Sequence, residues 1–246
     1  MTGPDTAWTE RFRVRSDDMD LHGRVAATAV CSWLQEVAGN HARSLGWGIE
    51  QLQPEQLTWV LARLHLRLDR LPAWRDEVAV TTWPAGVDRL YAVREFRIED
   101  GTGASGVATT GWVLVHLGRR RPVRPPATLV ALGREGLGRA LADPFEPLAP
   151  PTAAEHEEEF TVRFGDVDLN RHANNVRLIG WALETLPLDV LDRPLAELEV
   201  DFRGEARLGA TVRAIADPVA GDAAAFRHRL DGADGREILR AHSRFS

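Results

Sequence analysis

The stretch FRVRSDDMDLHGRVAATAVCSWLQE, residues 12–36, returns as FTVRFGDVDLNRHANNVRLIGWALE, residues 160–184. The two stretches align without gaps at an offset of 148 residues (160 minus 12). The identical pairs are Phe12/Phe160, Val14/Val162, Arg15/Arg163, Asp18/Asp166, Asp20/Asp168, Leu21/Leu169, Trp33/Trp181 and Glu36/Glu184. Because several matches are in rare residue types, we interpret the chain as an internal duplication.

A second pair of segments extends the duplication. LARLHLRLDRLPAWRDEV, which begins at Leu61, aligns with LAELEVDFRGEARLGATV, which begins at Leu195. The offset here is 134 residues (195 minus 61). The first copy therefore carries 14 extra residues (148 minus 134) between its predicted helix and this strand.

Each copy predicts one helix followed by an antiparallel meander. Apolar residues recur at helical spacing over residues 26–45 before Gly46, and a shorter helix around Val176 to Leu183 ends before Pro187. The strand candidates are residues 60–68, 78–83, 91–98 and 111–117, then 195–202, 211–215, 225–230 and 238–244. A sheet that wraps a long helix is the hotdog arrangement, so we predict an α+β tandem double hotdog joined as a pseudo-dimer.

The domain plan follows from the duplication. We expect an N-terminal hotdog over residues 8–127, a linker over residues 128–156 and a C-terminal hotdog over residues 157–246. The region between the copies is rich in proline, with one short helix predicted over residues 128–142. The acidic run that contains Glu157 to Glu159 is interpreted as a solvated lead-in to a strand.

Composition limits the classes of function. The net charge of -6 and the pI of about 5.8 give no reason to expect binding to nucleic acid or to a membrane surface. All 30 basic side chains are arginine. Cys31 is the single cysteine, and no Cys/His metal spacing is present, so we expect no disulfide and no metal. No stretch approaches the roughly 20 apolar residues of a membrane span, and we expect a cytoplasmic protein.

The second copy contains a polar cluster, DVDLNRHANN, between a strand and a helix. Asp168, Asn170 and His172 supply a carboxylate, an amide and an imidazole, and Asn174 and Asn175 follow them. Such groups can position water and polarise a carbonyl, and the backbone N–H groups of a helix start can hold an oxyanion. Each residue also has a plain structural explanation, because Asp and Asn favour caps and turns and a lone His is usually structural.

The first copy lacks this polar set. It has His22 and Arg24 where the second copy has Asn170 and His172. At the 134-residue offset it has Leu71 where the second copy has Glu205. A turn with a purely structural role would be retained in both halves, so we infer one active site per chain.

At these residues the sequence resembles the acyl-acyl-carrier-protein (acyl-ACP) thioesterases of plants and bacteria. DVDLNRHANNVRLIGWALE is similar to the family signature, and the resemblance covers roughly residues 12–245. It implies that Asp168, Asn170, His172 and Glu205 are catalytic, and that the enzyme hydrolyses fatty acyl-ACP in fatty acid biosynthesis without a cofactor of its own. Phosphopantetheine would arrive on the carrier protein. Many plant members have Cys directly after the Glu; here Ala206 cannot attack a thioester.

Our hypothesis for the mechanism begins with an attacking water. Glu205, helped by His172, would accept its proton, Asn170 would orient the carbonyl or the water, and Asp168 would align its neighbours. The alternative gives Asp168 itself the role of base or nucleophile.

Substrate contacts are more open. Trp33, Val37, Trp47 and Trp59 could line an acyl slot or be ordinary core residues, and Asn174 and Asn175 could contact substrate. Arg119, Arg120, Arg121 and Arg124 could dock an acidic carrier protein or be a solvated Arg-rich linker.

Three rival functions remain: an acyl-CoA thioesterase, a dehydratase that uses His41, and a silent acyl-binding module. The oligomeric state is also open, either a monomeric pseudo-dimer or a homodimer.

Overall fold

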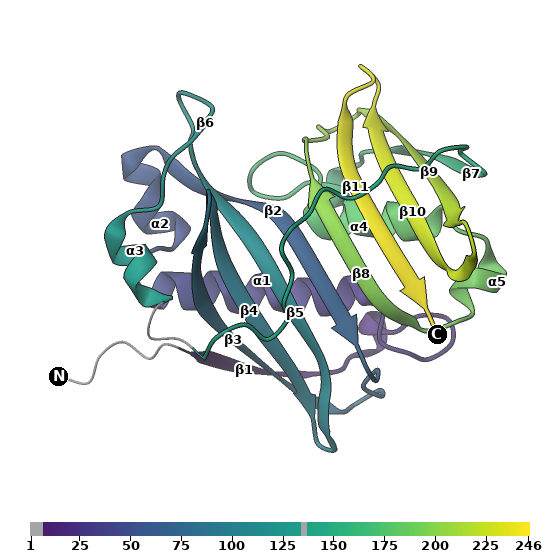
Figure 1. Ribbon diagram of the computed structural model, residues 1–246, viewed down its shortest axis with the longest axis horizontal. Helices are drawn as coiled ribbons and strands as arrows, with labels where there is room; N and C mark the ends of the chain where they lie inside the picture. The colour runs from purple at the N-terminus through teal and green to yellow at the C-terminus, as the bar shows by residue number, and fades with distance from the viewer. Residues whose placement is uncertain (1–6, 134–136) are drawn as a thin grey trace. The chain divides into compact units, whose positions relative to one another are not determined.

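The computed structural model describes residues 7–133 and 137–246, and these residues form two compact units that meet in the sequence between Pro144 and Phe145. Each unit contains one antiparallel sheet and one principal helix (Figure 1). Among the described residues, none of the helices combines the length and apolarity needed to cross a bilayer. The domain boundaries expected from the sequence stay a prediction.

The first unit is built on the sheet order β1-β3-β4-β5-β2. Its strands are β1 (Trp8–Arg13), β2 (Leu57–Leu68), β3 (Glu77–Asp88), β4 (Tyr91–Asp100), β5 (Gly103–His116) and the short β6 (Arg121–Pro122), which pairs with β5. Its helices are α1 (Ala27–Ser44), α2 (Ile49–Leu52) and α3 (Ala127–Leu132), with 3-10 turns η1 (Ser16–Asp18) and η2 (Gln53–Glu55).

Helix α1 buries one apolar face against this sheet (Figure 1). The buried positions recur three and four residues apart, as an amphipathic helix requires; they are Val30, Cys31, Trp33, Leu34, Val37, Ala38 and His41. The facing strands alternate, with Val78 and Val80 of β3 and Phe96 and Ile98 of β4 almost fully buried. Alternation on the strands and helical spacing on α1 therefore produce one shared core.

The second unit repeats the plan with a shorter helix. Its sheet order is β8-β11-β10-β9-β7. The elements are β7 (His156–Thr161), the 3-10 turn η3 (Phe164–Asp166), α4 (Asn175–Glu184), α5 (Leu188–Leu191), β8 (Leu195–Phe202), β9 (Thr211–Val219), β10 (Asp222–Gly232) and β11 (Glu237–Phe245). The exposed acidic residues Glu157 to Glu159 lie within β7, as expected of a solvated strand.

The internal duplication is visible in matched contacts. Phe12 stacks on Trp33 at 5.6 Å between ring centroids, and the equivalent Phe160 stacks on Trp181 at 5.5 Å. A backbone bridge joins Met19 to Val25 in the first unit, and the equivalent bridge joins Val167 to Ala173 in the second. The predicted α+β class, with one helix and one antiparallel sheet in each copy, is confirmed.

The segment after β6 departs from the sequence prediction. The helix predicted over residues 128–142 is wrong in extent, because α3 ends at Leu132 and residues 137–142 are not helical; residues 134–136 lie outside the described part. Gly138 adopts a left-handed φ of 79°. The backbone N–H groups of Ala140 and Leu141 donate to the Glu95 carboxylate, at 3.0 and 3.2 Å, and are thus held in an extended path.

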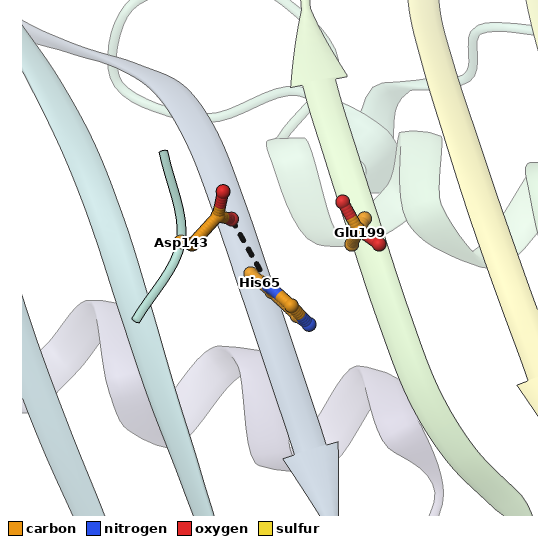
Figure 2. Close-up of side chains that lie close together, drawn as sticks. All are labelled: His65, Asp143 and Glu199. Carbon is orange, nitrogen blue, oxygen red and sulfur yellow. Dashed lines mark hydrogen bonds and ion pairs between the residues drawn. The ribbon is translucent and has the colours of Figure 1, made fainter. Parts of the chain in front are cut away.

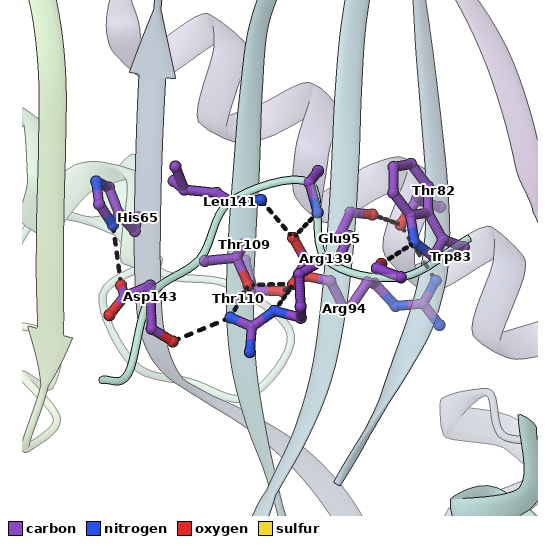
Figure 3. A network of polar contacts seen from close by, with 12 residues as sticks. His65, Thr82, Trp83, Arg94, Glu95, Thr109, Thr110, Arg139, Leu141 and Asp143 are labelled. Atoms are coloured by element: carbon purple, nitrogen blue, oxygen red, sulfur yellow. Dashed lines mark hydrogen bonds and ion pairs between the residues drawn. The ribbon is translucent and has the colours of Figure 1, made fainter. Parts of the chain in front are cut away.

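This extended path follows one row of side chains across the sheet of the first unit. Trp83, Glu95, Thr109 and His65 are register neighbours on β3, β4, β5 and β2. Trp83 donates to the Gly138 carbonyl at 2.8 Å, and fully buried Glu95 accepts from the Arg139 guanidinium at 2.5 Å (Figure 3).

At the other end of the row, His65 Nδ1 lies 2.9 Å from an Asp143 carboxylate oxygen (Figure 2). Two contacts therefore hold residues 137–143 on the sheet. Buried Glu95 accepts charge-assisted hydrogen bonds near the middle of the segment, and His65 contacts Asp143 at its end.

Candidate active site

The polar turn of the second unit lies between η3 and α4. The Asp168 N–H donates to the His172 carbonyl at 3.0 Å, and the Arg171 N–H donates to the Asp168 carbonyl at 2.9 Å. The Asp168 carboxylate accepts from the Asn170 N–H at 2.8 Å and from its side-chain amide at 3.5 Å. Asp168 therefore orders the turn that carries Asn170 and His172.

A second segment, directly after β8, meets this turn through the backbone. The Ala173 N–H donates to the Ala206 carbonyl at 2.7 Å, and a bridge pairs His172 with Arg207. This pairing brings His172 Nε2 to 3.0 Å from a Glu205 carboxylate oxygen. The His172 side chain is 23% exposed and the Glu205 side chain 59% exposed, so incoming molecules can reach the pair.

This arrangement has the geometry of a general acid–base pair. A carboxylate in hydrogen-bond contact with an imidazole can orient the ring and move a proton to or from a bound water. The start of α4 lies at the same turn, and a helix start leaves N–H groups without intrahelical acceptors. Asn174 takes one of them: its side chain accepts from the Val176 N–H at 2.9 Å, which is the capping contact that its residue type favours. Asn175 is the first residue of α4.

The equivalent turn of the first unit is closed by an internal ion pair. The Arg24 guanidinium lies 2.9 Å from the Asp20 carboxylate, whose other oxygen accepts from the His22 and Arg24 N–H groups. Burial raises the pKa of Asp20, but hydrogen bonds from Arg24 and His22 outweigh it and hold that pKa below its usual value. Leu71, at the position equivalent to Glu205, adds no charge. Arg24 stands where the second unit has His172, so this turn lacks the pairing of an imidazole with a facing carboxylate.

The residues expected to line an acyl slot lie inside or at the edge of the first unit. Trp33 and Val37 are buried in the face of α1 that packs on the sheet. Trp47 and Trp59 are half-buried and joined, because the Trp59 indole donates to the Trp47 carbonyl at 3.0 Å. Their contact with substrate stays a prediction.

The four arginines considered for carrier docking lie in and just after the β5–β6 hairpin. Arg119, Arg120, Arg121 and Arg124 are all exposed. Arg120 adopts a left-handed φ of 49°, and Arg121 begins β6. Arg119 to Arg121 thus lie in a hairpin and not in a linker, and they are solvated; their contact with a carrier protein stays a prediction.

Two other candidates from the sequence are buried in α1. Burial raises the pKa of the Cys31 thiol to about 12, so this thiol is protonated and inert at neutral pH. His41 is fully buried, and its Nδ1 lies 2.9 Å from the Arg94 guanidinium, which brings positive charge to the ring. A dehydratase would need an acidic group beside His41, whereas the neighbour of Nδ1 is the basic Arg94, so this contact argues against the dehydratase alternative.

Comparisons of the sequence with family models and with curated proteins agree with the resemblance to acyl-ACP thioesterases. The model of the acyl-ACP thioesterase N-terminal domain matches residues 5–132, and that of the C-terminal domain matches residues 150–246. An oleoyl-acyl carrier protein thioesterase of Arabidopsis thaliana, named as chloroplastic, is 31% identical over 83% of this chain and 62% of its own. A chloroplastic counterpart from Coriandrum sativum is 28% identical over 89% of this chain and 64% of its own. The chain spans about three fifths of the length of such curated relatives.

Solved structures give the same picture. An acyl-ACP thioesterase from Bacteroides thetaiotaomicron superposes with a TM-score of 0.87 at 25% identity, over 100% of both chains. The 12:0-ACP thioesterase from Umbellularia californica has a TM-score of 0.86 at 24% identity, over 98% of this chain and 94% of that one, which supports the fold. Both domain models match in order and together take in nearly the whole sequence. The chain therefore belongs to the acyl-ACP thioesterase family.

Proposed function

We propose that this protein hydrolyses the thioester between a fatty acyl chain and acyl carrier protein, releasing the free fatty acid and the carrier. The observation that carries the proposal is the 3.0 Å contact between His172 and Glu205 beside the start of α4. Membership of the family supports the choice of substrate. The equivalent turn of the first unit, where Arg24 pairs with Asp20, lacks the His172–Glu205 pair, which supports one active site per chain.

The reaction needs a water, a base and a stabilised oxyanion. Glu205, with His172, removes a proton from the water as its oxygen bonds to the thioester carbon. Backbone N–H groups at the start of α4 stabilise the tetrahedral oxyanion, and Asn170 orients the carbonyl or the water. When the C–S bond breaks, the proton returns from the pair to the departing thiolate of the phosphopantetheine arm.

Asp168 has a supporting role in this scheme. Its carboxylate accepts from the Asn170 backbone, which fits alignment of the turn better than attack on a carbonyl. Ala206 and the buried thiol of Cys31 both argue against a cysteine nucleophile. A cytoplasmic location, the absence of a cofactor or metal, and a role in fatty acid biosynthesis stay predictions.

A hydrolysis panel tests the proposal. Acyl-carrier substrates of graded chain length are incubated with the wild type and with His172→Ala, and the same acyl chains are supplied on CoA. We expect release of free carrier thiol by the wild type, near-complete loss in the variant, and a higher kcat/KM on the carrier than on CoA. No hydrolysis at any chain length would refute the thioesterase assignment, and a preference for CoA would move it to the acyl-CoA class.

A further inference from the structure

The segments that carry the candidate active site also carry exposed apolar and cationic residues. Phe164 is 88% exposed, Leu169 is 97% exposed and Leu208 is 59% exposed. Arg163, Arg171 and Arg207 are exposed beside them in sequence. Within residues 7–133 and 137–246, none of these three arginines forms an ion pair.

Backbone hydrogen bonds hold the segments that carry these side chains in one surface. The Gly209 N–H donates to the Val162 carbonyl at 2.9 Å, which joins the Leu208 segment to the strand end before Phe164. The bridge from His172 to Arg207 joins the same segment to the Leu169–Arg171 turn. The six residues therefore lie on backbone segments that are joined to the segments of the His172–Glu205 pair; we call them the site rim: Arg163, Phe164, Leu169, Arg171, Arg207 and Leu208.

The first unit is an internal control for the charge of the site rim. Where the second copy has Arg171 and Arg207, the first has Gly23 and Ala73. Arg15, equivalent to Arg163, is neutralised by Asp17 at 3.0 Å, and Gly165 stands at the position equivalent to Asp17. At these three positions the second copy carries arginines that form no ion pair among the described residues, whereas the first copy carries one arginine, which is paired with Asp17.

Arg171 carries a conformational cost that its counterpart avoids. Its φ is +64°, and the equivalent Gly23 has a φ of +72°. Side chains with a Cβ are disfavoured in this left-handed region, whereas glycine adopts it freely. Glycine at position 171 would therefore adopt the conformation of this turn without that cost.

We propose that the site rim is the docking surface for an acidic carrier protein, with the cations meeting its carboxylates and the exposed apolar side chains covered on docking. This inference rests on the proposed thioesterase function. The net charge of the chain is -6, so an acidic partner is repelled overall and needs a local cationic patch at its point of entry. Arginine forks suit carboxylates bidentately. Docking here delivers the thioester to the His172–Glu205 pair.

The test replaces two arginines of the site rim by the residues that the first copy has at the equivalent positions. In the variant Arg171→Gly/Arg207→Ala, each new residue is the one that the first unit tolerates at the equivalent position, and the glycine relieves the left-handed strain. The matched control is Arg11→Ala/Arg13→Ala, which removes two exposed arginines from β1. Two quantities are measured: the Kd for holo carrier protein, and the KM for acyl carrier and for a small acyl-pantetheine thioester.

We expect the site-rim variant to raise the Kd and the carrier KM about tenfold beyond any change in its KM for acyl-pantetheine, while the control changes neither the Kd nor the carrier KM. An unchanged Kd in the site-rim variant would overturn the proposal. A tenfold rise in the Kd on charge reversal of four other arginines, with the site rim intact, would overturn it as well; these four are Arg119, Arg120, Arg121 and Arg124. Failure of the wild type to cleave any thioester would refute the proposed function, and the Kd comparison would still decide the docking surface.

Discussion

Replacing Glu205 by Gln should abolish turnover while leaving the fold intact. The Glu205 carboxylate lies 3.0 Å from His172 Nε2, and its side chain is 59% exposed. A positioned general base contributes about 100- to 10,000-fold in rate, or about 3–5 kcal/mol of barrier. An exposed ion pair adds only about 0–1 kcal/mol to folding. We therefore expect kcat to fall by two to four orders of magnitude, with a change in unfolding free energy below about 1 kcal/mol.

The assay is the initial rate of thiol release from acyl carrier, followed alongside urea unfolding of the same preparation. Glu158→Gln is the matched control, because Glu158 is an exposed carboxylate on β7 outside the site. A kcat within threefold of the wild type would refute the role of Glu205. A large loss of stability would show instead that the substitution acts through the fold.

Three further predictions concern stability. Burial lowers the pKa of His228 from 6.5 to about 4, so the unfolded chain binds a proton that the native state refuses, and stability falls as the pH drops below 6.5. Between pH 7.5 and pH 5 the wild type should lose about 2 kcal/mol more than His228→Asn in urea unfolding, and equal losses would contradict this. Glu95→Gln should cost about 3 kcal/mol because it removes the buried partner of Arg139, and a thermal unfolding curve like that of the wild type would show that Glu95 does not hold residues 137–143. Asn174→Ala should cost about 1 kcal/mol through loss of the α4 cap, which Asn174→Asp should restore.

The sequence anticipates most of the fold because its periodicities are strong. The helix expected over residues 26–45 is observed as Ala27–Ser44, and the strand expected over residues 195–202 has the same ends in the structure. Strand β3 runs beyond the predicted Trp83 to Asp88, because its hairpin with β4 continues after a register shift between Pro84 and Gly86. Such pairing depends on the partner strand and is not visible in one segment.

The extended segment over residues 137–143 shows where local patterns fail. Glu95 would ordinarily be assigned to solvent, because carboxylates are rarely buried unless paired. Its partners Arg139, Ala140 and Leu141 lie more than 40 positions away in the sequence, so the contact that prevents a helix there is not local.

The candidate site was partly predictable. The Asp168–His172 turn stands out by its residue types. Glu205 is identified by the family resemblance and by the apolar Leu71 at the equivalent position of the first copy. Arg171 and Arg207 stand out only when the two copies are compared, since Gly23 and Ala73 occupy the equivalent positions in the first copy.

The central claim is that His172 and Glu205 act as one proton-transfer unit on a thioester. A double-mutant cycle with His172→Ala, Glu205→Gln and the combined variant, measured as kcat on acyl carrier, tests it most directly. The account predicts that the combined variant is no slower than the slower single variant, because either substitution already disables the pair. Rate losses that multiply would show that the two side chains act independently, and would contradict it.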